Sequence, residues 1–227
     1  MITLPTTIIK PQDARIVQVH ALPPVNSAQL LATAIANRFT NPPLWTPEML
    51  GDGSLFEGRT IREAAVLMPL VQRAEGLTVL LTQRTAHLHD HAGQISFPGG
   101  RRDPGDKDLV QTALRETAEE VGLAPNYIKI LGALGQYQTV TAYRVTPFVA
   151  LVDPGFALKL DAFEVADTFE VPLAFFMDPR NHQRRIIQTP LGERSFFAMP
   201  YDDAGKERFV WGATAAMLRN FYRFLTA

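Results

Sequence analysis

The sequence predicts a mixed α/β (α+β) fold, a sandwich in which strands enclose one or two helices within a single domain. Two short apolar runs, 64–71 and 77–82, are typical of strands and are joined by a turn near 74–76. Residues 106–121 are predicted to form a helix that stops at a glycine. Residues 211–225 are predicted to form a closing helix with one apolar stripe.

The segment before the first predicted strand differs from the rest of the chain in composition. Turn formers crowd residues 1–60, where one helical pattern starts at Ser27 and stops at Asn41-Pro42. We therefore expect residues 1–60 to form an N-terminal arm with one helix, packed on a core domain that covers 61–227.

Further elements are expected after the first two strands. They are strands at 95–97, 128–136 and 144–152, a segment at 164–177, and a hairpin of 184–188 with 195–199 around 190–192. Phe196, Phe197 and Tyr201 lie in this hairpin. Core packing is the favoured interpretation of these aromatic residues, and stacking on an adenine is the alternative.

The composition excludes several function classes. Lys and Arg total 22 and Asp and Glu total 23, so the chain lacks the basic excess of a non-specific nucleic-acid or anionic-membrane binder. The absence of cysteine excludes disulfides, thiol catalysis and Cys-ligated metals. No apolar run reaches the roughly 18 residues of a membrane span, and the first twenty residues do not resemble a secretory signal. We expect a soluble, cytoplasmic protein without nucleic-acid or membrane partners.

Three carboxylates share one side of the predicted helix 106–121. At about 100° per residue, Glu119 and Glu120 lie within roughly 60° of Glu116. Such like charges repel unless a cation lies among them, and hard oxygen ligands suit Mg²⁺ or Mn²⁺, which in turn bind phosphate oxygens. Arg115, four residues before Glu119, is placed to hold that carboxylate in position.

Two further features accompany the carboxylates. An apolar stripe is predicted to face the core along the same helix, formed by Val110, Leu114, Thr117 and Val121. Before the helix, Gly99-Gly100 permits a tight turn and a close backbone approach to a metal or a phosphate.

This segment resembles the Nudix box, a Gly-rich loop followed by a helix with R-E-x-x-E-E-x-G. The five fixed positions match at Arg115, Glu116, Glu119, Glu120 and Gly122. The resemblance implies a Nudix-type α/β/α sandwich with a mixed central sheet and a metal-dependent pyrophosphohydrolase. It also implies that Glu116, Glu120, Glu119 and the backbone of Gly100 hold the Mg²⁺ or Mn²⁺.

The match departs from the general pattern in the loop. Gly100 lies fifteen residues before Arg115, where the pattern has fourteen, and Lys107 replaces a glutamate between Asp106 and Asp108. The departures concern loop ligands such as Asp106 and leave the helix carboxylates intact.

An upstream signature resembles the coenzyme A pyrophosphatase branch, in which an LLTxR segment precedes FPGG. The matching residues here are Arg84, Gly93, Phe97, Pro98, Gly99 and Gly100. The longer box loop is also a feature of that branch, whereas His89 replaces its second arginine and Thr85 a small residue. The resemblance implies substrate contacts from Arg84, His89 and Gly99.

By this resemblance the chain would hydrolyse coenzyme A or a derivative to 3′,5′-ADP and 4′-phosphopantetheine, or its acylated form. The metal neutralises the pyrophosphate charge and lowers the pKa of a bound water. Glu119 and Glu164 are both candidates for the base that takes the proton of the water, with Arg115 as a supporting catalytic residue. The sequence does not choose between the two.

Other interpretations remain open at this point. His87, His89 and His91 form an alternating set that a bland loop, a substrate-facing loop or a His-metal site would explain. The substrate alternatives are ADP-ribose, NADH or another dinucleotide, and a nucleoside triphosphate. A non-catalytic nucleotide-sensing module is the alternative from another class, and residues 1–60 are a candidate homodimer interface.

Overall fold

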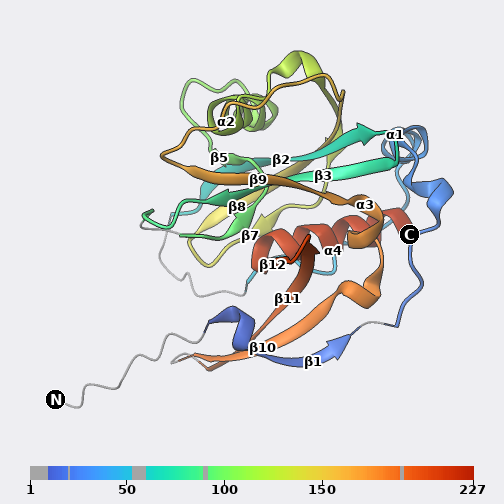
Figure 1. The fold of residues 1–227 in the computed structure, drawn as a ribbon, viewed down its shortest axis with the longest axis vertical. Coiled ribbons are helices and arrows are strands. Elements are labelled where there is room, and N and C mark those ends of the chain that lie inside the picture. Colours follow the sequence, from blue (N-terminus) through green and yellow to red (C-terminus); the bar gives the residue numbers. More distant parts are fainter. Residues whose placement is uncertain (1–9, 20, 53–59, 89–91, 190–191) are drawn as a thin grey trace.

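The computed structural model describes residues 10–19, 21–52, 60–88, 92–189 and 192–227. Its strands are β1 (Arg15–Val19), β2 (Arg62–Arg73), β3 (Gly76–Arg84), β4 (Ile95–Ser96), β5 (Gly99–Arg101), β6 (Ile128–Ala133), β7 (Tyr137–Gln138), β8 (Tyr143–Val152), β9 (Val165–Pro172), β10 (Gln183–Thr189), β11 (Gly192–Asp203) and β12 (Lys206–Trp211). Its α-helices are α1 (Ala32–Thr40), α2 (Leu109–Val121), α3 (Leu173–Phe176) and α4 (Gly212–Thr226). The mixed α+β architecture predicted from the sequence is confirmed (Figure 1).

Strand β2 organises the central mixed sheet. Residues 62–71 of β2 pair in parallel with β8, while residues 64–66 pair with β5 and residues 70–73 pair with β3, both antiparallel. Strand β3 then pairs with β9 and β4, and β8 pairs with β6 and β7. As a result, the start of β2, the end of β5, the end of β3 and the start of β9 share one end of the sheet (Figure 1).

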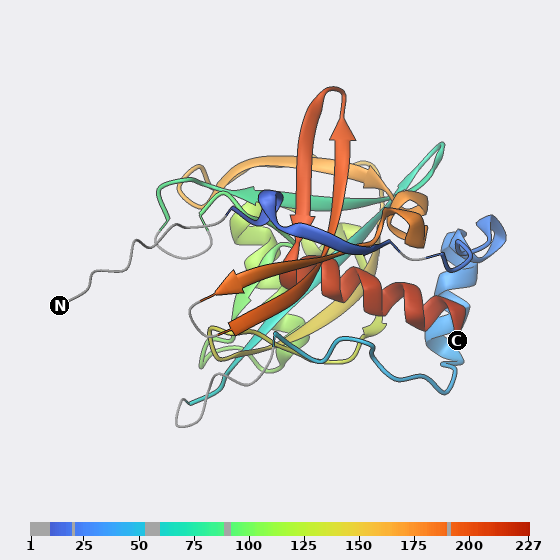
Figure 2. The same ribbon diagram turned by 90° about the horizontal axis from the view of Figure 1, so that it is seen from below.

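Helices cover both faces of this sheet. Successive side chains of β2 point to opposite faces and so pack against a helix on each side. Ala65 and Leu67 pack with Ala113 of α2, whereas Met68 and Leu70 belong to the cluster that includes α4. A second, four-stranded sheet of order β1-β10-β11-β12 lies beyond α4 (Figures 1 and 2).

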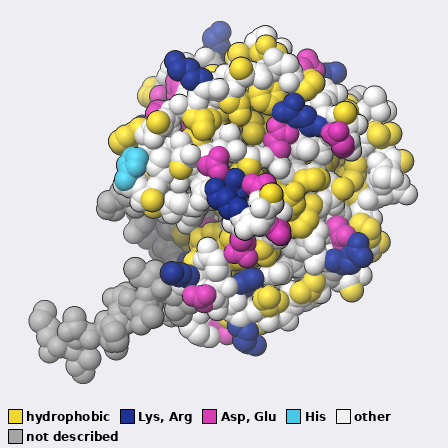
Figure 3. Space-filling model, in the orientation of Figure 1, with side chains coloured by type: hydrophobic (Ala, Val, Ile, Leu, Met, Phe, Trp, Pro, Cys, Tyr) yellow, Lys and Arg dark blue, Asp and Glu magenta, His cyan; other side chains and the backbone are white. Residues whose placement is uncertain are grey.

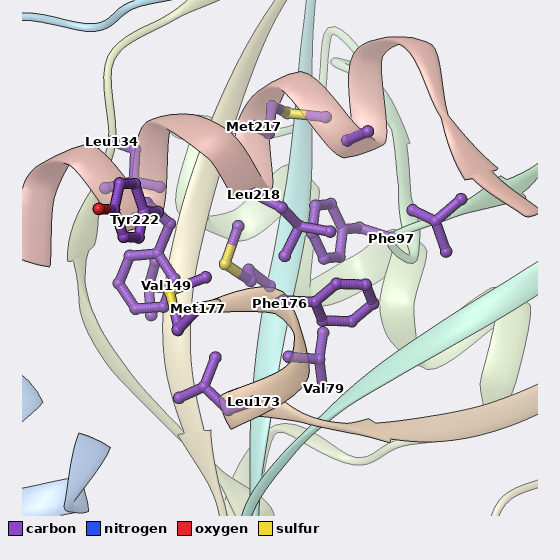
Figure 4. Packing of buried hydrophobic residues seen from close by; sticks show 14 of the residues in the cluster. Val79, Phe97, Leu134, Val149, Leu173, Phe176, Met177, Met217, Leu218 and Tyr222 are labelled. Carbon is purple, nitrogen blue, oxygen red and sulfur yellow. The ribbon is translucent and has the colours of Figure 1, made fainter. Parts of the chain in front are cut away.

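The main core lies between the central sheet and α4. Figure 4 shows Leu218 and Tyr222 of α4 directed toward Val149 of β8 and Phe176 of α3. These side chains are at most 2% exposed, so each contributes nearly its full hydrophobic transfer energy, about 1.5–3 kcal/mol. The described residues contain no helix long and apolar enough to cross a membrane.

The described residues of the N-terminal segment, 10–19 and 21–52, contact elements from the far end of the chain. Strand β1 pairs with β10, and the Tyr222 hydroxyl donates to the carbonyl of Pro23. The amide of Asn220 donates to the Met49 carbonyl at 2.7 Å and accepts from the Met49 N–H at 2.9 Å. Helix α1 adds Ile35, which is fully buried in the main core.

Most predicted elements are confirmed, with shifted ends. The strands predicted at 64–71 and 77–82 are the paired β2 and β3, and those at 184–188 and 195–199 form the hairpin of β10 and β11. Two of the predicted turn residues, 190 and 191, lie outside the described residues.

Three local expectations need correction. The helix predicted from 106 begins at Leu109, because Asp108 takes an extended conformation and its side chain accepts from the Gln111 N–H. The strand predicted at 128–136 ends at Ala133. Strand β1 was not expected, because five exposed residues between prolines carry little strand signal.

The hairpin aromatics have separate surroundings. Phe197 is buried in the core, Phe196 packs edge-on against Trp211, and Tyr201 packs edge-on against Phe175. The core interpretation is thus confirmed for Phe197 and for Tyr201, which packs against the main core, whereas Phe196 is only partly buried and lies outside the core clusters.

Ile35 provides a test of how much the N-terminal segment stabilises the fold. Ile35→Ala should lower the free energy of unfolding by about 2–5 kcal/mol, because it leaves a cavity in the core. Leu31→Ala, in the same segment and 58% exposed, should change it by no more than about 0.5 kcal/mol. Urea unfolding followed by circular dichroism measures both. Equal effects would contradict the view that this segment is part of the cooperative core.

Candidate active site

The candidate site lies where the Gly99–Gly100 backbone crosses helix α2. A Cβ atom on Gly100 would lie closer than 3.0 Å to the carboxylate atoms of Glu116, and one on Gly99 would lie as close to the backbone of β2. Gly99 also has φ +148°, a conformation that other residues rarely adopt. Gly99 is therefore required by the backbone around it, whereas a side chain at Gly100 would have to displace the Glu116 carboxylate from the loop.

Glu120 is the most enclosed of the predicted site residues. It is 6% exposed, and one carboxylate oxygen accepts the Gly99 N–H at 3.1 Å. Burial raises the pKa of Glu120 to about 7, an effect that the Gly99 hydrogen bond and the nearby Arg84 oppose. Nothing in the helical pattern predicted that this one carboxylate would be buried.

Glu116 lies one helical turn before Glu120 and faces the same loop. Its side chain is 19% exposed and accepts from Arg115 Nη1 at 3.0 Å. Burial raises the pKa of Glu116, and this outweighs the opposing effect of Arg115. Two partly desolvated carboxylates thus lie side by side with the loop backbone.

Arg84 and Glu164 approach the same carboxylate from the sheet. Arg84 Nη1 lies 3.7 Å from Glu120 Oε1 and 3.9 Å from Glu164 Oε2. The backbone of the next residue, Thr85, donates its N–H to the Glu164 carbonyl at 2.9 Å, which fixes the spacing of the two chains. Within the described part of the chain, the buried Nε of Arg84 has no hydrogen-bond partner.

Arg115 is held by an acidic residue that sequence reasoning did not assign to the site. Asp106 receives Arg115 Nε at 3.0 Å and Nη2 at 2.9 Å, and also the Asp103 N–H and the Thr112 hydroxyl. The paired Arg115 keeps the pKa of Asp106 well below its usual range. The sequence feature that could have indicated this role is the pair of aspartates, Asp106 and Asp108, on either side of Lys107.

Glu119 is separated from the other two helix carboxylates. It is 61% exposed and contacts Arg115 Nη1 at 2.9 Å, as the i, i+4 spacing predicted. The crowding of three carboxylates on one side is thus resolved into two that face the glycine loop and one that faces solvent.

In the structure, the buried face of α2 is rotated about the helix axis relative to the predicted apolar stripe. The buried positions are Thr112, Ala113, Thr117, Glu120 and Val121, whereas Val110 and Leu114 are only partly buried. The helix turns its small side chains toward the sheet, because the loop and β2 pass close to it. This rotation carries Glu120 inward.

The histidine set is only partly described. His87 is exposed, and its ring centroid lies 4.9 Å from that of Phe163, next to Glu164. His89, a predicted substrate contact, and His91 lie outside the described residues. Among the residues that are described, no three His, Asp or Glu side chains converge as a ready metal cage.

The donor set nevertheless suits a hard divalent cation. Mg²⁺ is usually bound by one or two carboxylates, with waters and substrate phosphates completing its coordination. Glu116 and Glu120, which repel each other and are partly desolvated, provide two such carboxylates beside a glycine backbone. On the face shown in Figure 3, acidic and basic side chains are interspersed in small groups, without a large patch of one sign.

Comparison with known proteins gives consistent matches. The model of the NUDIX domain matches residues 61–206. A Yersinia pestis protein named "Uncharacterized Nudix hydrolase NudL" is 38% identical over 175 residues, which is 77% of this chain and 85% of the relative. A Yersinia pseudotuberculosis relative of the same name has the same values.

Two solved structures illustrate the more distant matches. A Caenorhabditis elegans Ap4A hydrolase in a binary complex has 25% identity and a TM-score of 0.43, over 48% of this chain and 80% of its own. A MutT/nudix family protein from Enterococcus faecalis has 16% identity and a TM-score of 0.45, over 77% of this chain and 66% of its own.

The burial of Glu120 predicts a pH dependence of stability in the absence of divalent cations. Its folded pKa of about 7 exceeds the ordinary value of 4.5, so folding favours the protonated form. This contribution is complete below about pH 4.5 and is lost as the pH rises through 7. Glu120→Gln, which is neutral at every pH, should therefore show a smaller fall in stability from pH 5 to pH 8.

Urea unfolding at the two pH values measures the difference. Glu119→Gln is the matched control, because that carboxylate lies in solvent, and it should keep the fall seen with the unmodified protein. If Glu120→Gln also kept it, the buried position of Glu120 would be wrong.

Proposed function

Because the chain belongs to the Nudix hydrolases, we propose that it hydrolyses the pyrophosphate bond of coenzyme A or an acyl derivative, giving 3′,5′-ADP and 4′-phosphopantetheine or its acylated form. Nudix hydrolases act on small nucleotide derivatives, and the proposal names one of them. In this proposal residues 61–227 are the catalytic domain and residues 1–60 are its arm.

One observation carries the choice of substrate. The two segments that resemble the coenzyme A branch, LLTQR and FPGG, meet at a single carboxylate. Gly99 donates its N–H to Glu120, and Arg84 lies 3.7 Å from the same side chain. The branch signature and the Nudix box thus contribute to one site, which supports a shared role in binding and cleaving the substrate.

Hydrolases of this family generally use divalent cations. In this chain Glu116 and Glu120 would hold Mg²⁺ or Mn²⁺ together with the backbone at Gly100, and Glu119 would contribute from the solvent side. A bound ion supplies charge neutralisation at the pyrophosphate and a more acidic water. The residues themselves fix the donors: Asp106 holds Arg115, which orients Glu116 and Glu119.

Arg84 is the proposed phosphate contact. Its side chain is 26% exposed and lies 3.7 Å from Glu120. Its Nε is buried and has no hydrogen-bond partner among the described residues. A planar guanidinium matches a phosphate with two parallel hydrogen bonds, and a phosphate oxygen would give it the partner it lacks. His89 and the backbone of Gly99 complete the proposed contacts.

Glu164 is the proposed general base. Its carboxylate lies 3.9 Å from Arg84, beside Glu120, and is 42% exposed, whereas Glu119 is 61% exposed and points to solvent. As water adds to one phosphorus, the P–O bond of the bridge breaks. Glu164 takes one proton of the water, and the two products leave as phosphate monoesters.

Product analysis by mass spectrometry tests the substrate. With Mg²⁺ or Mn²⁺, the protein should release 3′,5′-ADP and phosphopantetheine from coenzyme A. Glu120→Gln should lower turnover at least about a hundredfold. Glu75→Gln, on the turn at the opposite end of the sheet, is the matched control and should retain turnover. Cleavage of ADP-ribose, NADH or a triphosphate in place of coenzyme A would contradict the substrate and retain the chemistry.

The choice of base has its own test. Glu164→Gln should lower kcat by about 10²–10⁴-fold and remove the acidic limb of the pH–rate profile. Glu119→Gln should lower kcat less and keep that limb, because its carboxylate faces solvent. The reverse pattern would assign the base to Glu119.

A further inference from the structure

A second concave site lies beside the proposed catalytic centre. It is a cavity of about 410 Å³, lined by Arg62 and Glu63 from the start of β2, by Arg101 and Arg102 at the end of β5, and by Pro104. Pockets for small ligands typically have about 300–1,000 Å³. The cavity is open to solvent, so a group at the end of a longer substrate has access to it.

Its lining is rich in arginine, and the three cations differ in how well they are paired. Arg102 contacts Glu63 at 3.2 Å and donates to the carbonyls of Asp106 and Lys107, so it is already engaged. Arg101 is 55% exposed and has one acidic neighbour, Asp103, at 3.8 Å.

Arg62 is held differently. Its guanidinium lies 4.9 Å above the ring of Tyr143, a contact that fixes its position without neutralising it. Among the described residues, Arg62 forms no ion pair. Arg62 and Arg101 thus present positive charge that the surrounding carboxylates leave largely available, which is the arrangement that binds an anion.

The cavity is one residue away from the catalytic loop. Arg101 follows Gly100 directly, and its carbonyl accepts Arg115 Nη2 at 3.2 Å. Arg115 in turn contacts Glu116, so the backbone of one short strand joins the two sites. The cavity therefore adjoins the catalytic loop along the backbone of β5, next to the proposed position of the pyrophosphate at Glu116 and Glu120.

We propose that the cavity formed by Arg62, Arg101 and Arg102 binds a phosphate monoester carried by the substrate, separate from the pyrophosphate that is cleaved. The inference rests on the proposed function, in which this group is the 3′-phosphate of the adenosine half. A monoester phosphate carries close to two negative charges, which Arg62 and Arg101 neutralise by direct contact. The cavity thereby selects nucleotides with this phosphate over those without it.

Binding of products to the whole protein tests the cavity without any turnover. By calorimetry, adenosine 3′,5′-bisphosphate should bind about tenfold or more tightly than 5′-AMP, because it gains charge-assisted contacts. Arg62→Gln and Arg101→Gln, made separately, should each reduce this preference severalfold. Arg144→Gln is the matched control: Arg144 is exposed on β8 opposite Glu63 but does not line the cavity, and this variant should keep the preference.

The outcomes separate the cavity from the proposed function. Equal binding of the two nucleotides, or a preference that both cavity variants retain, would overturn the cavity. Inorganic phosphate that bound as tightly as the bisphosphate, with the same sensitivity to Arg62→Gln, would overturn its assignment to a substrate group. If coenzyme A were not cleaved while the bisphosphate preference and its loss in both variants held, the proposed substrate would fail and the cavity would stand.

Kinetic measurements provide an independent test of the cavity. The ratio of kcat/KM for coenzyme A to that for 3′-dephospho-coenzyme A should exceed one and should fall about tenfold in Arg62→Gln and Arg101→Gln. Melting temperatures of the variants check that each is folded. An unchanged ratio in both folded variants would overturn the proposal.

Discussion

The close contact between the Gly99–Gly100 backbone and helix α2 is the constraint on which the site depends. It leaves no room for a side chain on Gly99, places the Glu116 carboxylate where a side chain on Gly100 would lie, and directs the Gly99 N–H to Glu120. The same contact excludes water from Glu120, so the carboxylate is costly to ionise until a cation is nearby. The close packing that builds the site is therefore also what makes the ionised Glu120 carboxylate unfavourable.

Arginines balance the acidic site in two different ways. Arg115 donates hydrogen bonds to Asp106, Glu116, Glu119 and the Arg101 carbonyl, so it acts as a fixed part of the scaffold. Among the described residues, the Arg84 side chain makes ion-pair contacts only at the long distances of 3.7 and 3.9 Å, so it retains donors for an incoming anion. The difference follows from position, because Arg115 projects from a helix onto a loop and Arg84 lies at the end of strand β3.

The sequence was informative where the pattern was local. The glycine that ends α2 has φ +72°, and the two apolar runs before the box form the paired strands β2 and β3. The rotation of α2, which buries Glu120 and Thr117 and leaves Leu114 partly exposed, depends on how closely β5 passes, and no helical spacing encodes that distance. The role of Asp106 likewise depends on a loop conformation that brings it to Arg115, nine residues along the chain. Strand β1 depends on a partner more than 160 residues away.

That long-range pairing has a consequence for the order in which the chain folds during synthesis. β1 pairs with β10, the Pro23 carbonyl accepts from Tyr222, and the Arg38 guanidinium donates to the Phe224 carbonyl. None of these partners has left the ribosome when the first half of the chain has been made. The central sheet and α2 make contacts over shorter sequence separations and can form earlier. The N-terminal segment can reach its final position only after α4 has been synthesised. Residues 15–38 are thus synthesised early but are among the last to reach their final positions.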